Sequence, residues 1–316
     1  MTLRGRPRWY KPDVGLSVRM VMTIFLLGAV YLIFAGVLTR LGYGIIAIPV
    51  ALVIAVVQFF FADKIALASM GAKEVTEAEA PQLHDMIGRL AMQANLPKPK
   101  VAIVNSSLPN AFATGRNKDN AVVAVTTGIL DTLSEPELEA VLAHELTHII
   151  NRDMLVMTIA TFFSMVIGLI LQNFFYFGMF GGYGGGYGRR RDDGEGNAFI
   201  LVLLASLVAY AVSFVLIRTL SRYRELAADR GAALITGAPQ NLASALIRLD
   251  NVIHNSGPRI PQRDFRQAAS VSALFIVPAI RGDSLATLFS THPSTEDRVR
   301  RLKEMQKQME SAQYLG

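Results

Sequence analysis

The stretch SEPELEAVLAHELTH, residues 134–148, predicts the helix around which the rest of the fold is arranged. Ser134, Pro136 and Glu137 are typical of a helix start, with a capping serine, a proline in the first turn and a glutamate three residues after the cap. Apolar residues then recur at helical spacing: Leu138, Val141, Leu142 and Ile149. This stripe predicts that the helix buries one face.

Two histidines and a glutamate lie in the middle of this helix. Residues four apart lie on the same helix face, so His144 and His148 can direct ring nitrogens at one metal ion. Glu145 is rotated by about 100° around the helix axis, and can face a water molecule beside the metal without becoming a ligand. This pattern is typical of a zinc hydrolase in which the glutamate is the general base. The alternative is a pair of surface histidines that bind no metal.

The composition indicates a membrane protein. The hydrophobic fraction is 52%, the charged fraction is 18% and the mean hydropathy is +0.36. Four long apolar runs cover residues 20–39, 41–62, 154–180 and 198–217. About 20 apolar residues cross the hydrocarbon core of a bilayer, so four transmembrane helices are expected. A buried helix hairpin in a soluble core is the alternative for the last two runs.

The distribution of charge favours a cytoplasmic N-terminus over a nucleic-acid interface. Basic residues precede the first apolar run: Arg4, Arg6, Arg8, Lys11 and Arg19. Such an excess of basic residues before a span is typical of the cytoplasmic side. The glycine-rich and arginine-rich segment 181–191 comes without a recognition helix or stacking fold, so we expect a connection between membrane helices and no nucleic-acid partner. The chain has no cysteine, which excludes disulfides and cysteine metal ligands.

A third metal ligand is predicted in the segment that follows the last two apolar runs in the sequence. If those runs form a hairpin, the chain returns to the membrane face that it left. Glu225 then lies about 12 Å along a helix from that face, and His148 about 9 Å. Glu225 would complete a site of two histidines and one glutamate with an open position. Asp229, one turn later, would hold a ligand imidazole in the required tautomer. The alternative is a solvated acidic pair bound to neighbouring arginines.

Together these motifs resemble the HtpX family of membrane-bound heat-shock zinc metalloproteases. The resemblance is carried by HELTHIINRD at residues 144–153, ELAAD at 225–229, PNAFA at 109–113, TTG at 126–128 and HPS at 292–294. It implies one zinc ion per subunit, held by His144, His148 and Glu225. It also implies a multi-pass protein of the inner or plasma membrane, with its active site facing the cytoplasm. The implied substrates are polypeptides, in particular misfolded or damaged membrane proteins, as part of protein quality control and the stress response.

The expected fold is mostly α: an integral membrane protein with four transmembrane helices and a zincin-like α+β catalytic domain containing a small β-sheet. The expected segments are a basic cytoplasmic stretch (1–19), two transmembrane helices (20–62), a first catalytic part (63–153), a transmembrane hairpin with a glycine-rich loop at 181–197 (154–217) and a second catalytic part (218–316). The oligomeric state is not predicted.

Strands and a turn are expected between the second and third apolar runs. Residues 100–104 and 121–125 are rich in β-branched and small apolar residues, and 117–120 is typical of a turn. Residues 110–114 are expected to form an edge strand beside the cleft, where Asn110 would contact a substrate backbone. An ordinary sheet packed on the helix is the alternative.

His292 is a candidate for stabilising the oxyanion, and Arg298 is its rival. A helix-start turn is the alternative for the segment around His292. At the level of function, the alternatives to an endopeptidase are a zinc-binding membrane scaffold or sensor without proteolytic activity and a CAAX-type prenyl-protein protease. Glu145 weighs against a scaffold, because a purely structural zinc site needs no base.

Overall fold

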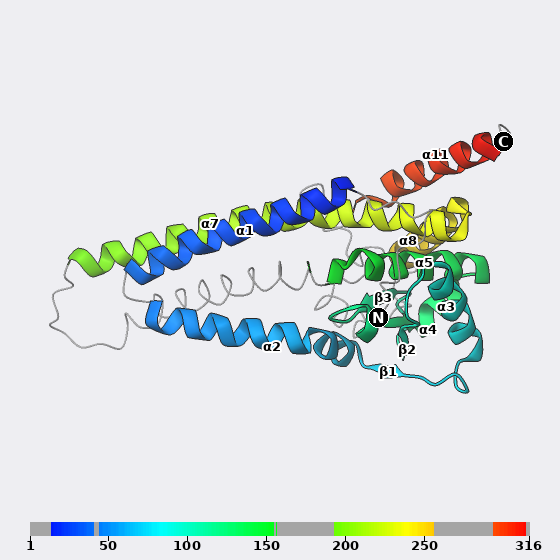
Figure 1. Cartoon of the computed structure of the whole chain (residues 1–316), viewed down its shortest axis with the longest axis horizontal. Helices are drawn as coiled ribbons and strands as arrows, with labels where there is room; N and C mark the ends of the chain where they lie inside the picture. The colour runs from blue at the N-terminus through cyan, green and yellow to red at the C-terminus, as the bar shows by residue number, and fades with distance from the viewer. Residues whose placement is uncertain (1–13, 41–43, 155, 157–192, 256–292, 314–316) are drawn as a thin grey trace, which may run out of the picture. The chain divides into compact units, whose positions relative to one another are not determined.

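The computed structural model describes residues 14–40, 44–154, 156, 193–255 and 293–313 (Figure 1). The elements are, in chain order, α1 (Val14–Arg40), α2 (Gly44–Met70), β1 (Ala72–Glu74), α3 (Pro81–Gln93), β2 (Lys100–Val104), β3 (Ala111–Thr114), the 3-10 helix η1 (Lys118–Asn120), β4 (Val122–Thr126), α4 (Thr127–Thr132), α5 (Glu135–Asn151), α7 (Asp193–Thr236), α8 (Pro239–Asn255) and α11 (Thr295–Gln313). Helices predominate and the strands form one small mixed sheet, as the sequence predicts.

The chain divides into two compact units. Residues 18–60 and 156–220 form one of them, called here the apolar unit. Residues 1–17, 61–155 and 221–316 form the other, called here the sheet unit because it holds all the described strands.

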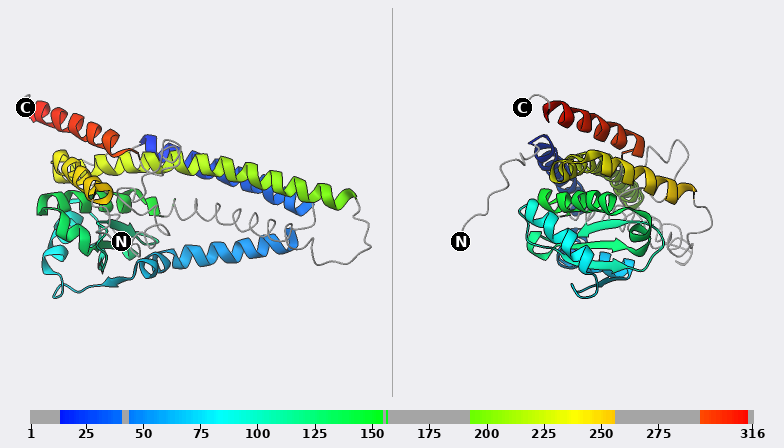
Figure 2. Two further views of the ribbon diagram at one scale, coloured as in Figure 1. Left: turned by 180° about the vertical axis from the view of Figure 1, so that it is seen from behind. Right: turned by 90° about the vertical axis from the view of Figure 1, so that its right-hand side faces the viewer.

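The apolar unit is built from helices that turn large apolar side chains outward. The helices α1 and α7 lie side by side (Figures 1 and 2), and Phe34, Leu38 and Val202 are buried between them. On the outer surface, Phe25 and Ile33 are each 70% exposed. A protein surface in water rarely carries so many exposed apolar side chains, whereas a lipid-facing surface does.

Length and hydropathy identify the membrane-spanning candidates. Helix α1 and the segment Ile200–Thr236 of α7 are each long and apolar enough to cross a bilayer. In α2, Ile48–Phe61 and Asp63–Met70 make a third candidate if they form one bent span. These helices cover the first and fourth apolar runs of the sequence and the second from residue 44 onward, whereas the third run, residues 154–180, lies outside the described residues except for 154 and 156. The chain is therefore a multi-pass membrane protein.

The sheet has the strand order β1-β2-β4-β3. Strands β2 and β4 run parallel, whereas β1 and β3 pair antiparallel with their neighbours. All five residues of β4 are buried, as expected for a central strand made of valine, alanine and threonine. Both predicted strands are confirmed, β4 being displaced by one residue, and β3 is confirmed as an edge strand.

The predicted turn at 117–120 connects β3 to β4. Asn117 caps η1 by accepting a hydrogen bond from the backbone N–H of Asn120 at 2.9 Å. Gly115 has φ +136°, and a Cβ at this position would lie 2.4 Å from the carbonyl oxygen of Asn120. Only glycine fits both the backbone conformation and the close approach.

Helix α5 begins where the sequence predicts. The backbone N–H of Ser134 donates to Glu137 Oε2 at 2.9 Å, and this bond forms part of a capping box. Helix α5 packs against β3 and β4 and crosses one face of the sheet (Figure 2), while α3 and α8 pack against α5. Leu142 and Leu146 are fully buried in the resulting core. The middle of α5 is thus held rigidly inside the sheet unit.

Candidate metal centre

Two imidazoles from successive turns of α5 face each other. The Nε2 atoms of His144 and His148 lie 3.2 Å apart, and the ring centroids lie 4.7 Å apart. The side chains are 1% and 9% exposed respectively. The two rings therefore direct nitrogen atoms at one buried point, as the spacing of four residues requires.

Glu225 of α7 supplies a carboxylate to the same point. Its Oε2 lies 3.5 Å from His144 Nε2, and its Oε1 lies 3.7 Å from His148 Nε2. One ligand atom from each of the three residues falls within 4.8 Å of the others. The structure thus brings together the three residues that the sequence predicts as metal ligands, although Glu225 is 77 residues beyond His148 along the chain.

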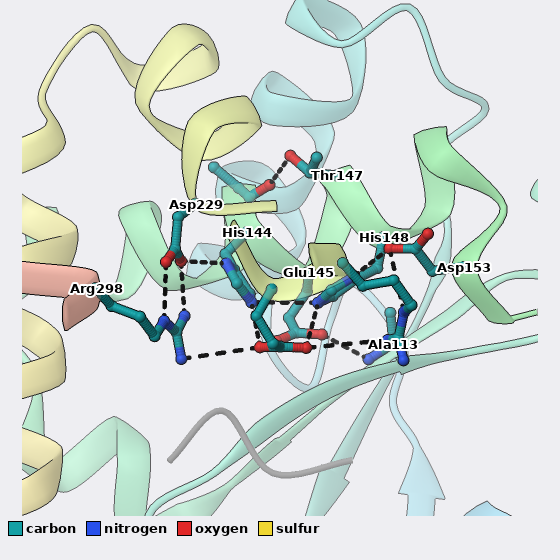
Figure 3. Close-up of polar contacts among 11 residues, drawn as sticks. Ala113, His144, Glu145, Thr147, His148, Asp153, Asp229 and Arg298 are labelled. Atoms are coloured by element: carbon teal, nitrogen blue, oxygen red, sulfur yellow. Dashed lines mark hydrogen bonds and ion pairs between the residues drawn. The ribbon is translucent and has the colours of Figure 1, made fainter. Parts of the chain in front are cut away.

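A glycine allows α7 to approach α5 this closely. A Cβ added at Gly231 would lie 2.3 Å from Cγ2 of Thr147, which is fully buried on α5. The Thr147 hydroxyl donates to the carbonyl oxygen of Ala143 at 2.9 Å, so its rotamer is fixed (Figure 3). The crossing of the two helices at Gly231 therefore sets the distance between Glu225 and the histidines.

Glu145 points toward β3. The backbone N–H of Ala113 donates to Glu145 Oε2 at 2.9 Å (Figure 3). Burial raises the pKa of Glu145 above its ordinary value, and it outweighs the opposing effect of His148 and His144. A carboxylate with a raised pKa, fixed by one hydrogen bond beside the two imidazoles, has the properties of a general base.

An aspartate lies behind each imidazole (Figure 3). Asp229 Oδ1 lies 3.0 Å from His144 Nδ1, and Asp153 Oδ2 lies 2.6 Å from His148 Nδ1. A carboxylate in this position accepts the Nδ1 proton and leaves Nε2 free to bind a metal. Asp229 was predicted for this position. The sequence alone predicts no role for Asp153, although an acidic residue five positions after His148 could reach back to it.

Arg298 of α11 binds Asp229. Its Nε and Nη2 donate to the two carboxylate oxygens at 2.8 and 2.6 Å, and the side chain is 1% exposed. This bidentate contact pairs the buried carboxylate of Asp229 with a positive charge. Arg298 therefore holds the carboxylate that lies behind His144, and a role of Arg298 in stabilising an oxyanion stays a prediction. His292, its rival, lies outside the described residues.

The buried charges of this site favour a cation. Four carboxylates and two guanidiniums surround the two imidazoles: Glu145, Asp153, Glu225, Asp229, Arg224 and Arg298. With neutral imidazoles their formal charge is −2. Burial lowers the pKa of His144, but Asp229 and Glu225 outweigh burial and raise that pKa to about 9. A divalent cation would balance the cluster without protonating the histidines.

Asn110 lies directly before β3 and is fully buried. Its backbone N–H donates to Thr126 Oγ1 at 2.8 Å, and its carbonyl oxygen accepts from the backbone N–H of Thr126 at 2.9 Å. These bonds fix the start of the edge strand. A contact of Asn110 with substrate stays a prediction.

The family model and the relatives that match this chain are all named as peptidases or proteases. The model of "Peptidase family M48" matches residues 77–306. A "Protease HtpX homolog" of Moorella thermoacetica is 55% identical over 299 residues, which cover 94% of this chain and 97% of the relative. A "Protease HtpX homolog 2" of Methanosarcina mazei is 52% identical over 305 residues, 96% of this chain and 99% of the relative.

A similar fold is found in the crystal structure of S. mikatae Ste24p. The TM-score is 0.50 and the sequence identity is 19%, with 92% of this chain and 67% of that chain covered. At this identity the likeness concerns the fold alone.

Proposed function

Because the chain belongs to peptidase family M48 and is a membrane metalloprotease, we propose that it is a zinc-dependent endopeptidase whose metal ligands are His144, His148 and Glu225. The observation that carries this proposal is the convergence of the three side chains within 4.8 Å of one another. Two imidazoles and one carboxylate are a donor set that zinc accepts in catalytic sites, where a further position stays open. The formal charge of the buried cluster also fits a divalent ion.

The proposed mechanism assigns the proton transfers to Glu145. Zinc, when bound, supplies a Lewis acid that polarises the scissile carbonyl and brings the pKa of water near neutrality. Glu145 accepts a proton from the attacking water and later delivers it to the leaving amine nitrogen. Asp229 and Asp153 hold the Nδ1 protons of the two imidazoles, so that neither ring rotates during the reaction.

The edge strand β3 supports a role in binding extended polypeptides. Antiparallel pairing with β4 occupies one side of β3, and the N–H of Ala113 is directed to Glu145. We propose that an extended substrate backbone aligns with β3, which would bring a peptide bond to the base. Asn110 and His292 are proposed to contact the substrate near the scissile bond.

The membrane context is part of the proposal. Four spans, with the third in residues 154–180, would place residues 63–153 and 218–316 on one side of the membrane. The basic residues before α1 favour the cytoplasmic side of the inner or plasma membrane. We propose misfolded or damaged membrane proteins as substrates, because a cytoplasm-facing membrane protease meets the exposed segments of such proteins.

The decisive test separates metal binding from hydrolysis. Purified Glu145→Ala protein in detergent is expected to retain zinc, because Glu145 is not a ligand, and to lose cleavage of unfolded casein by about 100-fold or more. Zinc content and cleavage are measured on the same preparations. Cleavage by Glu145→Ala protein at the wild-type rate would refute the assignment of the base. Zinc without cleavage in the wild-type protein would favour a scaffold.

A further inference from the structure

Each metal-facing histidine has its own aspartate, and each aspartate has its own buried arginine. His144, Asp229 and Arg298 form one such set, and His148, Asp153 and Arg224 form the other. Three different segments of the sheet unit contribute to them: the second half of α5 with the residues that follow it, the last third of α7 and the start of α11. The sets are called here the Arg298 set and the Arg224 set.

The Arg298 set is tightly connected. Two nitrogens of Arg298 donate to both oxygens of Asp229, which is the bidentate geometry that a guanidinium prefers with a carboxylate. The remaining terminal nitrogen, Nη1, lies 3.8 Å from Glu225 Oε2. Every side-chain nitrogen of Arg298 thus faces a carboxylate of the site.

The Arg224 set repeats the arrangement more loosely. Arg224 Nε lies 3.5 Å from Asp153 Oδ2, the oxygen that contacts His148 Nδ1. Arg224 Nη2 lies 4.0 Å from Glu225 Oε1. The side chain of Arg224 is 9% exposed. Both arginines therefore reach Glu225, each at a different carboxylate oxygen.

We propose that Arg224 and Arg298 are paired positioning residues that orient all three metal ligands, and this proposal rests on the zinc peptidase function proposed above. Each arginine holds an aspartate against one imidazole, and the two together hold the carboxylate of Glu225 from both sides. Neither arginine touches substrate. An exposed oxyanion donor would need a free N–H aimed at the scissile carbonyl, whereas the nitrogens of Arg298 are directed at Asp229 and Glu225.

The physical reason for two arginines is the balance of buried charge. Four carboxylates in one buried cluster repel one another. If neutral residues stood in place of the two arginines, the cluster would keep a negative formal charge that a single divalent cation could not balance. Two guanidiniums reduce the charge to the value that one divalent ion neutralises. Lysine would supply the charge but not the planar pair of donors.

Zinc affinity and peptide cleavage are measured for Arg298→Gln, Arg298→Lys, Asp229→Asn and the double variant Arg298→Gln/Asp229→Asn. The second set is tested in parallel with Arg224→Gln and Asp153→Asn. Chelator competition gives the dissociation constant for zinc, and cleavage of casein gives kcat and KM. Matched controls are Arg300→Gln, which removes an exposed arginine of α11, and Arg222→Gln, which removes an exposed arginine of α7.

The expected result is a zinc affinity about 10- to 100-fold lower for Arg298→Gln and a smaller loss for Arg224→Gln. Because Arg298 acts through Asp229, the zinc affinity of the double variant should be about equal to the lower of the affinities of Arg298→Gln and Asp229→Asn. Arg298→Lys should recover part of the affinity. The value of kcat should fall while KM stays close to that of the wild type, and the controls should match the wild type.

Two results would overturn the proposal. One is an unchanged zinc affinity in both Arg298→Gln and Arg298→Lys with a raised KM, which would make Arg298 a substrate contact. The other is multiplication of the single losses in the double variant, which would mean that Arg298 and Asp229 act independently. A wild-type protein that binds no zinc would instead refute the zinc peptidase function itself, so the two failures are distinguishable.

Discussion

Glu225 adds a third possible metal ligand to the two histidines of α5. Its two carboxylate oxygens divide between the two imidazoles, at 3.5 and 3.7 Å from their Nε2 atoms. A histidine pair at this spacing occurs on many helices without a metal. The buried carboxylate on a second helix distinguishes this pair from such surface histidines, because it brings a third possible ligand atom within 4.8 Å of the two ring nitrogens.

Glu225→Gln should therefore weaken zinc binding strongly. The substitution preserves the shape of the side chain but removes its charge and one acceptor. We expect a loss of affinity of about 100-fold or more, at the upper end of the effects seen when groups around a bound metal are altered. Chelator competition measures the affinity, and Glu304→Gln on the exposed face of α11 is the control. An unchanged affinity would exclude Glu225 as a ligand.

Glu137 couples the start of α5 to α8. Its carboxylate accepts hydrogen bonds from the Ser244 hydroxyl at 2.5 Å and from the backbone N–H of Ser134 at 2.9 Å, and Arg248 Nε lies 3.3 Å away. Burial raises the pKa of Glu137, but Ser244, Ser134 and Arg248 together outweigh burial and lower the pKa. The charged form is therefore favoured in the native state.

A depressed pKa in the native state stabilises the fold above the pKa of the unfolded chain. Glu137→Gln should lower the free energy of unfolding by about 1.5–3 kcal/mol at pH 7, the range for hydrogen bonds to charged groups. The difference from wild type should shrink as the pH falls below about 4, because the wild-type carboxyl is then protonated too. Thermal unfolding in detergent from pH 7 to pH 3.5 measures it, with the exposed Glu135→Gln as control. A difference that grows on acidification would contradict the assignment.

At the scale of elements, the site depends on the crossing of α5 and α7. Each helix alone presents only part of the donor set, and Gly231 determines how closely the two helices approach. Thr147 fills the space opposite the glycine, and its hydroxyl is committed to the backbone of α5. A methyl group added at this crossing would therefore displace α7 and, with it, Glu225.

Gly231→Ala is expected to destabilise the sheet unit by about 1–3 kcal/mol, because the added methyl group would overlap Thr147 Cγ2. Zinc affinity should fall as well, since α7 must shift and carries Glu225 with it. Gly231→Ala/Thr147→Ala should recover part of both losses by opening the same space. Thermal unfolding and chelator competition on the single and double variants measure these effects. A single variant as stable as the wild type would show that the crossing can relax.

At the scale of the whole molecule, a polar centre and lipid-facing helices belong to one chain. The centre lies entirely within the sheet unit, and the apolar unit exposes the large side chains that a bilayer covers. The proposed four spans would place residues 189–191 on the outer side, where three consecutive arginines would depart from the usual excess of basic residues on the cytoplasmic side. The orientation of the chain is therefore best measured directly.

The absence of cysteine makes this measurement simple. With four spans, Arg190→Cys in intact cells should react with a membrane-impermeant maleimide. Gln308→Cys on the exposed surface of α11 should react only after permeabilisation, because α11 belongs to the sheet unit, which we propose faces the cytoplasm. Labelling of both positions only after permeabilisation would show that residues 154–217 do not cross the membrane.

Local sequence patterns predict most of the described helices and strands, because helix caps, apolar stripes and apolar runs each depend on residues close together in the chain. The cap at Ser134, the apolar stripe of α5 and the runs within α1 and α7 depend on spacing along one element, and the structure contains these elements where they are expected. Strands β2 and β3 follow in the same way from short β-branched and apolar segments. Glu225 and Asp229 were accessible to prediction because the hairpin topology limits where a third ligand can come from.

By itself, the sequence determined that His144, Glu145 and His148 lie together on one helix and that the chain has membrane character, since each depends on a period or a run that one element contains. Only the tertiary structure decided which charges meet behind the metal ligands. Arg298 reaches Asp229 across 69 residues, and Arg224 reaches Asp153 across a similar separation, through the packing of α5, α7 and α11. No periodicity encodes such pairs, because their distance depends on helix crossings such as that of Gly231 with Thr147 and on the burial that forces opposite charges together.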